Sequence, residues 1–448
     1  VIGVANYVNG VDEIQGAGDT IVRSNSGHNT LDFSNTALTG VVEIDGGAGN
    51  DAITASNLSA GSYRGGAGDD TLIAGDVAAT FLYSGTNNGF DTLVNNATGI
   101  SVAKAETAGT VIGVANYVNG VDEIQGAGDT IVRSNSGHNT LDFSKTVLTG
   151  VAQVDAGAGN DTVFATASNS SKIVYEGGSG TDKLVVTLTL AQAQNTTLLT
   201  QLAALVPGAM NGTVNAAGLN FEARNFENFE FRLQVGDTYL PISTKILIGT
   251  AGNDGDLAVE SHPNGAGGVT SQPWMIFGLN NNDIMTGSNG NDILVGGHGN
   301  DTMNGGNGND TFLVGGTNHG NDVFNGGAGA DRILASENNT NIGLAAANAL
   351  QSIEEISGNG FANVKVVGTG GNDVLDFKNV TITGITEIDG GNNDDTITTS
   401  DKSAAHYRGG HGNDSFVLGA ANATLLYAGN NNGADSFSGN VVGDAVIH

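Results

Sequence analysis

Short apolar segments alternate with turns rich in glycine and asparagine along most of this chain. Between residues 283 and 312, the segments Ile284-Met285, Ile293-Leu294, Thr302-Met303 and Thr311-Phe312 recur every nine residues. Each segment is too short for an independent strand, but it can pair with the next coil and bury its central apolar side chain. The pattern therefore predicts a β-solenoid, in which successive coils stack.

An aspartate closes each turn of this central run. Asp283, Asp292, Asp301 and Asp310 are nine residues apart, and each ends a six-residue turn such as Gly296 to Asp301. Stacked coils place such aspartates in rows, and glycine tolerates the backbone dihedrals of tight turns whose carbonyls point inward. Because calcium takes six to eight oxygen ligands, the pattern favours calcium sites. The alternative is a metal-free solenoid, since Asn-Asp and Asp-Gly pairs are also ordinary turn formers.

The stretch from Gly278 to Leu334 resembles the nonapeptide repeat of RTX proteins, GGxGxDxUx. A fifth and a sixth unit follow at Asp322 and Asp331, after one short insertion near Val314. The resemblance implies a right-handed parallel β-roll with two nonapeptides per coil, and calcium held between turns one coil apart. The pairs that it implies are Asp283 with Asp301, Asp292 with Asp310, Asp301 with Asp322, and Asp310 with Asp331.

The candidate calcium ligands are the aspartates that end such turns and the glycines of the best-matching turns. In the central run they are Asp283, Asp292, Asp301, Asp310, Asp322 and Asp331, with Gly296, Gly297, Gly299, Gly305, Gly306, Gly308, Gly326, Gly327 and Gly329. Elsewhere in the chain they are Asp51, Asp70, Asp91, Asp161, Asp182, Asp254, Asp373, Asp395, Asp414 and Asp435.

A duplication with a period of 110 residues organises the rest of the chain. Val1 to Ser34 is identical to Val111 to Ser144, and a more diverged third copy includes Leu375-Asp376-Phe377. In copies one and three the aspartate turns recur at matching places, so we expect them to line a single edge of each solenoid. We therefore expect an all-β fold of right-handed parallel β-roll or β-solenoid modules in tandem, with one small helix-containing insertion.

Five parts are expected. They are solenoid copies at 1–110 and 111–182, an insertion at 183–243, the nonapeptide roll at 244–337, and a third solenoid copy at 338–448. In the insertion, alanines and leucines at helical spacing predict one helix from Leu188 to Val206, ended by Pro207, and a phenylalanine-rich β segment follows. The insertion is interpreted as a capping or interlocking element, with a ligand-binding or carbohydrate-binding patch as the alternative. Asp256 to Trp274 is expected to form a loop.

Two kinds of turn depart from the repeat sequence. Asn29 and Asn139 stand where the third copy has Asp373. An amide offers an oxygen but no charge, so calcium there should be weaker or absent. The turns that lack one or both of the first two glycines are also weaker candidates, because they depart from the repeat pattern; they are Gly278-Leu279, Ala156-Gly157, Thr317 to Asp322 and Gly249-Thr250.

Composition limits the function. The 46 acidic and 15 basic residues give a net charge of -31, which disfavours nucleic acid and anionic membranes and makes an ion-free chain repel itself. There is no cysteine, so disulfides and thiol catalysis are excluded, and no apolar run is long enough to span a membrane. The chain begins with Val1 inside one repeat and ends with His448 inside another, so we expect it to continue beyond both ends.

These observations favour a calcium-stabilised structural or adhesive repeat protein, not an enzyme, on the bacterial cell surface or secreted outside the cell. An adhesin, a surface-layer protein and a filament subunit all fit, with self-assembly or cell-surface polysaccharide as the partner. The resemblance implies type I secretion. The alternative is the C-terminal repeat region of a secreted RTX hydrolase or toxin, because the same repeats resemble those that follow secreted catalytic domains.

Overall fold

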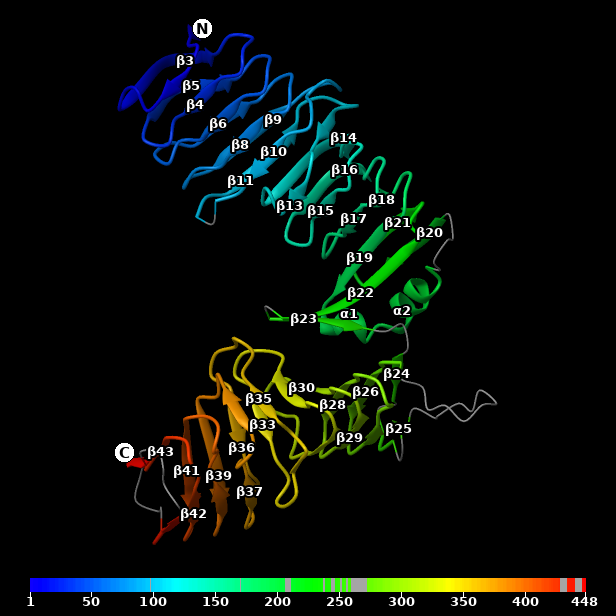
Figure 1. The fold of residues 1–448 in the computed structure, drawn as a ribbon, viewed down its shortest axis with the longest axis vertical. Helices are drawn as coiled ribbons and strands as arrows, with labels where there is room; N and C mark the ends of the chain where they lie inside the picture. Colours follow the sequence, from blue (N-terminus) through cyan, green and yellow to red (C-terminus); the bar gives the residue numbers. More distant parts are fainter. Residues whose placement is uncertain are drawn as a thin grey trace. The chain divides into compact units, whose positions relative to one another are not determined.

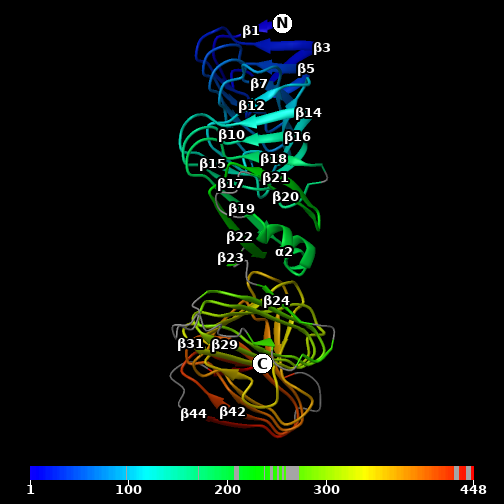
Figure 2. The same cartoon turned by 90° about the vertical axis from the view of Figure 1, so that its right-hand side faces the viewer.

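The chain forms a parallel β-solenoid (Figure 1), confirming the predicted fold class. The computed structural model describes residues 1–96, 98–169, 171–205, 211–236, 238–242, 246–249, 252–254, 257–258, 272–427, 433–439 and 445–448. The described chain divides into two compact units, Val1–Arg232 and Leu233–His448. In each unit the coils stack on one another, and Figure 2 shows this stack from the side for the first unit.

Two faces of stacked short strands make up the first unit. One face is a sheet in the order β1 (Ile2–Gly3), β3 (Glu13–Arg23), β5 (Ala37–Asp45), β7 (Gly61–Arg64), β9 (Ala79–Tyr83), β11 (Ser101–Ala105), β14 (Glu123–Arg133), β16 (Val147–Asp155), β18 (Ile173–Glu176), β21 (Leu219–Arg224) and β20 (Asn211–Ala216), with β12 (Val111–Gly113) also on β14. The other face contains β2 (Tyr7–Val8), β4 (Thr30–Asp32), β6 (Ala52–Thr54), β8 (Thr71–Ile73) and β10 (Thr92–Val94), then β13 (Tyr117–Val118), β15 (Thr140–Asp142), β17 (Thr162–Phe164), β19 (Lys183–Leu188) and β22 (Asn228–Val235).

The second unit repeats this plan. After β23 (Thr238–Ile242), one sheet contains β24 (Ile246–Ile248), β26 (Met275–Asn280), β28 (Ile293–His298), β30 (Thr311–Val314), β32 (Arg332–Ala335), β35 (Glu355–Ser357) and β38 (Thr381–Thr383). A second contains β25 (Leu257–Ala258), β27 (Ile284–Thr286), β29 (Thr302–Asn307), β31 (Val323–Ala328) and β34 (Leu350–Gln351). The last coils add β33 (Asn341–Gly343), β36 (Lys365–Val367), β39 (Glu387–Asn392), β41 (Ala405–His411), β43 (Ala423–Leu425) and β45 (Ala445–Ile447), and β37 (Val374–Asp376), β40 (Thr396–Thr398), β42 (Ser415–Leu418) and β44 (Ser436–Gly439).

The core is a column of apolar side chains, one from the centre of each short strand. Leu31, Ile53, Leu72 and Leu93 are in register on β4, β6, β8 and β10, and none is more than 7% exposed. Burying each such side chain stabilises the fold by about 2 kcal/mol. The apolar centre of each short segment therefore packs on the next coil, as the sequence predicted.

The duplicated sequence adopts the same structure twice. β3 and β4 have the same bounds as β14 and β15 after a shift of 110 residues. Tyr7 stacks on Phe33, and Tyr117 stacks on Phe143, each with ring centroids 4.6 Å apart. Identical sequence therefore produces the same coil in both places.

The helical segment differs from the prediction of one helix over Leu188 to Val206. Leu188 belongs to β19, and two short helices follow, α1 (Leu190–Ala193) and α2 (Thr196–Ala203). The chain leaves the helical conformation at Asn195, whose side chain accepts the backbone N–H of Leu198 and caps α2. An asparagine that bonds its own backbone in this way favours a helix start over a helix interior. Pro207 and most of the predicted loop from Asp256 to Trp274 lie outside the described residues.

Within 183–243, strands continue the sheets of the first unit. β19 pairs with β17 in parallel, and β21 pairs with β18 in parallel, whereas β20 and β21 form an antiparallel pair. Phe221 lies on β21 and Phe231 on β22, and both are buried. None of the described helices is both long and apolar enough to cross a membrane.

Candidate metal centre

The turn aspartates form hydrogen-bonded ladders between coils. The backbone N–H of Asp283 donates to Oδ1 of Asp301, which lies 18 residues further along, at 2.9 Å. The N–H of Asp301 then donates in the same way to Oδ1 of Asp322, at 2.8 Å. We call each such aspartate a rung and each connected series a file.

Five files follow from these bonds, which are 2.7 to 2.9 Å long. They are Asp51-Asp70-Asp91; Asp161-Asp182; Asp254-Asp283-Asp301-Asp322; Asp292-Asp310-Asp331; and Asp373-Asp395-Asp414-Asp435. The structure thus brings together all four pairs that the repeat pattern implied, including the two across the insertion. The central roll has two files, and each duplicated module has one.

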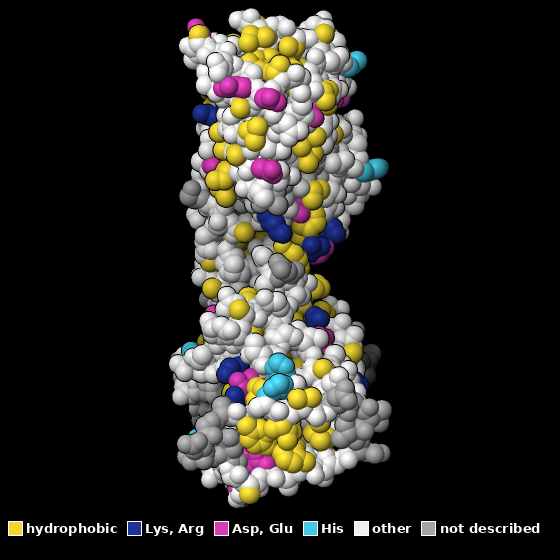
Figure 3. Space-filling view, turned by 90° about the vertical axis from the view of Figure 1, so that its left-hand side faces the viewer, with side chains coloured by type: hydrophobic (Ala, Val, Ile, Leu, Met, Phe, Trp, Pro, Cys, Tyr) yellow, Lys and Arg dark blue, Asp and Glu magenta, His cyan; other side chains and the backbone are white. Residues whose placement is uncertain are grey.

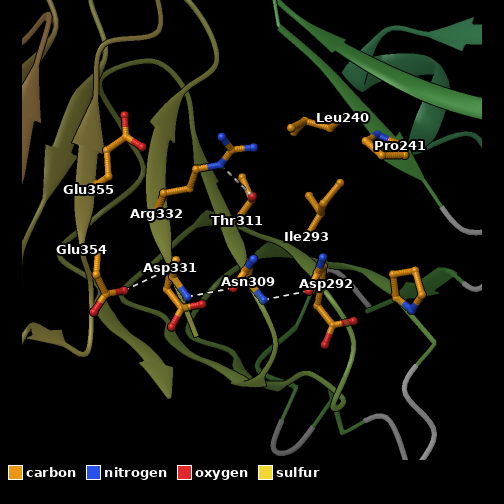
Figure 4. Close-up of a pocket in the computed structure, with 13 residues that line it drawn as sticks. Leu240, Pro241, Asp292, Ile293, Asn309, Thr311, Asp331, Arg332, Glu354 and Glu355 are labelled. Carbon is orange, nitrogen blue, oxygen red and sulfur yellow. Dashed lines mark hydrogen bonds between the residues drawn. The ribbon is translucent and has the colours of Figure 1, made fainter. Parts of the chain in front are cut away.

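Two glutamates that the sequence analysis did not select extend the files. Glu354 Oε2 accepts the N–H of Asp331 at 2.7 Å, and Glu227 Oε2 accepts the N–H of Asp182 at 2.7 Å. Figure 4 shows Asp292, Asp331 and Glu354 along one side of a cavity of about 500 Å³ in the second unit. No sequence signal marked these glutamates, because neither follows a glycine-rich turn.

In ten of the rungs the second carboxylate oxygen, Oδ2, accepts no hydrogen bond. Asp254 and Asp435 are partly buried, and every other rung is at most 2% exposed. Oδ2 is buried and has no hydrogen-bond partner in ten of them: Asp51, Asp70, Asp161, Asp182, Asp283, Asp301, Asp310, Asp331, Asp395 and Asp414. Leaving a buried charged oxygen unsatisfied costs several kcal/mol, so an arrangement repeated ten times points to a missing positive charge.

The first glycine of each turn makes room for this oxygen. A Cβ built on Gly278 would lie 2.6 Å from Asp283 Oδ2 and 2.5 Å from the carbonyl oxygen of Gly296 on the next coil. At Gly390 the corresponding distances to Asp395 Oδ2 and the Gly409 carbonyl are both 2.6 Å. At both turns, a carboxylate oxygen and a backbone carbonyl therefore lie so close to the glycine that a Cβ would overlap them.

The other two glycines of a turn serve the stacking of coils. Gly297 and Gly299 have φ angles of +98° and +135°, which L side chains rarely adopt. A Cβ on either would also overlap the backbone of Leu279 or Asn281 on the preceding coil. In a complete turn, the first glycine therefore lies beside the carboxylate and the other two pack against the neighbouring turn.

Burial raises the pKa of several rungs when no cation is present. It raises the pKa of Asp301 to about 6, of Asp310 to about 7 and of Asp322 to about 8, and the adjacent rung carboxylates add to the effect. The pKa of Asp395 in the third copy rises to about 7 for the same reasons. A divalent cation beside Oδ2 would oppose both causes.

Local donors satisfy the first rung of two files. Oδ2 of Asp292 accepts the backbone N–H of Ser288, and Oδ2 of Asp373 accepts the N–H of Thr369. Ser288 and Thr369 stand where a complete turn has its second glycine. These two rungs therefore need a cation less than the ten with an unpartnered oxygen.

The two asparagines that replace aspartate carry their own donor. The side-chain amides of Asn29 and Asn139 donate to the carbonyls of Ala5 and Ala115, both on the preceding coil. The neighbouring rungs still bind them in the usual way, because Oδ1 of Asp51 and Oδ1 of Asp161 accept their backbone N–H groups. An amide thus keeps the ladder without adding a buried charge.

The donors available suit a hard cation. They are carboxylate and carbonyl oxygens, the ligand types that calcium prefers. Among the described residues, no three histidine, aspartate or glutamate side chains lie close enough to hold a metal by themselves. Backbone carbonyls would therefore have to supply much of any coordination shell. On the face drawn in Figure 3, acidic side chains are scattered, since most rungs are buried.

A solenoid that stacks glycine turns over rows of buried carboxylates, with one oxygen of many of them unpaired, has the features of a cation-binding repeat protein. Residues 37–57, 62–76, 153–170, 277–312 and 317–340 match the family model described as the RTX calcium-binding nonapeptide repeat (4 copies). The chain therefore carries RTX repeats, which confirms the resemblance, and the matched segments include rungs from Asp51 to Asp331. Among the curated proteins compared, none matches the chain.

Proposed function

We propose that the chain is a calcium-stabilised structural or adhesive repeat protein that folds on binding calcium outside the cell. The observation that carries this proposal is the set of ten rungs whose buried Oδ2 atoms lack a partner. Calcium would be held by these oxygens together with carbonyls of the glycine turns. It would also offset part of the net charge of -31.

The extracellular setting follows from calcium supply. Extracellular calcium modules bind at affinities of about 0.1 to 1 mM, a concentration that the cell interior does not reach. A chain of this charge would stay loose inside the cell and order after export, for which type I secretion is the proposed route. The sequence repeats its modules and has no recognised catalytic motif. Such a chain suits an extended structural protein, as a surface layer, a filament or an adhesin requires.

Calcium titration of the purified chain, followed by circular dichroism and thermal unfolding, tests the folding part. We expect β-structure to be lost in chelator and regained with millimolar calcium, with magnesium much less effective because it demands a stricter octahedral geometry. Equal order and equal Tm in chelator and in calcium would refute the proposal. Electron microscopy after adding calcium tests assembly, and a strictly monomeric calcium-loaded chain would contradict the surface-layer and filament forms.

A further inference from the structure

The last rung of the first and fifth files differs from the others. Oδ1 of Asp91 accepts the N–H of Asp70 at 2.9 Å, as in every file, but Oδ2 accepts the hydroxyl of Tyr83 at 2.9 Å. In the third copy, Oδ1 of Asp435 accepts the N–H of Asp414 at 2.9 Å, and Oδ2 accepts the hydroxyl of Tyr427 at 2.7 Å. The oxygen that is unpartnered in the preceding rung is therefore satisfied here by a neutral donor.

The two tyrosines occupy equivalent places. Each lies eight residues before its aspartate, and each turn between them lacks the first glycine of the repeat, with Thr86 and Asn430 in its place. The turn that ends at Asp322 has the same length and also lacks that glycine, but Val314 stands at the tyrosine position. The side chain of valine cannot donate a hydrogen bond, so the file that ends at Asp322 lacks this contact.

We propose that Tyr83 and Tyr427 terminate the calcium files of the outer modules, and so fix how many ions each module holds. This inference rests on the proposed calcium function. A cation that used Oδ2 of Asp91 would have to displace a hydroxyl buried at 2% exposure together with its hydrogen bond. Upstream rungs such as Asp70 offer the same atom without that competition. Asp91 and Asp435 thus act as hydrogen-bonded ends of their files and are not calcium ligands through Oδ2.

The tyrosine also has a role when no calcium is present. Its hydroxyl provides the last rung with a partner that the preceding rungs lack, so the end of the file should remain ordered in chelator. A structural tyrosine without this role is available for comparison in the same module. The hydroxyl of Tyr63 accepts the backbone N–H of Ser56 at 2.9 Å and has no carboxylate partner.

The test compares Tyr83→Phe with Tyr63→Phe in the chain 1–448. Bound calcium is counted by equilibrium dialysis with atomic absorption, and Tm is measured in chelator and in calcium. We expect Tyr83→Phe to bind one additional ion per chain, to lose about 2–4 °C in chelator and to recover that loss in calcium. Tyr63→Phe should leave the ion count unchanged and lower Tm in both conditions.

An unchanged ion count in Tyr83→Phe, with the same loss of Tm in both conditions, would overturn the inference. Should Tyr83→Phe fail to fold, the partly buried Tyr427 provides the second variant, with Tyr407→Phe as its control, since the Tyr407 hydroxyl accepts the N–H of Ser400 at 3.0 Å. A wild-type chain that binds no calcium would refute the proposed function itself. A wild-type chain that binds calcium, with counts unchanged by Tyr83→Phe and Tyr427→Phe, would refute this inference alone.

Discussion

One carboxylate oxygen of Asp301 connects this residue to Asp283, because the N–H of Asp283 donates to Oδ1 of Asp301 at 2.9 Å. The other oxygen, Oδ2 of Asp301, is buried without a hydrogen-bond partner. The first oxygen fixes the distance between two coils. The second adds an unneutralised charge to the interior, which costs free energy unless a cation lies beside it. Stacking and ion binding are therefore coupled in a single side chain.

Asp301→Asn should separate these two roles. The amide oxygen can still accept the N–H of Asp283, but the buried negative charge is removed. In chelator we expect Tm equal to or above that of the wild type, and in calcium a smaller gain in Tm than the wild type shows. Asp19→Asn, at an exposed aspartate outside the files, is the matched control. An undiminished calcium-induced gain for Asp301→Asn would contradict a ligand role for this rung.

Gly296→Ala should destabilise the central roll through its Cβ. That atom would overlap Oδ2, Cγ and Cβ of Asp301, so we expect a loss of about 2 kcal/mol or more in urea unfolding, together with weaker calcium binding. Gly370→Ala is the control, because it lies in the aspartate turn of Asp373 and its Cβ would meet nothing nearer than 3.9 Å. Equal effects from the two substitutions would show that the space beside Oδ2 is unimportant.

The calcium-free chain should become less stable as pH rises. The pKa values of Asp301, Asp310 and Asp322 are raised to about 6, 7 and 8, whereas unfolded aspartates titrate near 3.9. The folded chain therefore binds these protons more tightly, and the stability they contribute is complete below about pH 4 and is lost progressively as pH rises to about 8.

Urea unfolding at pH 5 and pH 8, with and without calcium, measures this dependence. Without calcium the chain should resist urea better at pH 5. With calcium the order should reverse, because only deprotonated carboxylates bind the ion. The same order in both buffers would mean that calcium does not act at these buried rungs.

Asn139→Asp should convert a neutral rung into a charged one, as Asp373 is in the third copy. The substitution removes the amide that donates to the Ala115 carbonyl and buries a new charge. We expect a lower Tm in chelator and a larger calcium-induced gain than the wild type, measured by differential scanning calorimetry. Asn29→Asp is the corresponding change in copy one. An unaltered calcium response in both variants would show that the charge of this rung is irrelevant.

Several features could be read from the sequence because they depend on spacing alone. A nine-residue period places Asp283 two turns before Asp301, and any stacked coil with that period brings the two together. The insertion near Val314 shifts two rungs by the same number of residues, so the pairs across it were also predictable. The apolar centre of each short segment follows from the two-residue alternation of strands.

Contacts at the ends of files and in irregular segments required the tertiary structure. Glu354 and Glu227 extend files although neither belongs to a repeat turn. Asn195 separates two short helices where the sequence predicted one continuous helix. The local sequence does not determine which backbone group a side chain will hydrogen-bond when the two are separated by 23 or 45 residues.

The sequence by itself thus determined that this chain stacks in coils, that aspartates form rows along them and that glycines form the tight turns, because a strict period repeats the same local geometry. Only the tertiary structure decided which hydrogen-bond donor each second carboxylate oxygen meets: none at Asp70, the N–H of Thr369 at Asp373 and the hydroxyl of Tyr83 at Asp91. The physical reason is that the repeat period fixes the backbone position of each aspartate. The hydrogen-bond partner of its side chain depends instead on the conformation of each individual turn.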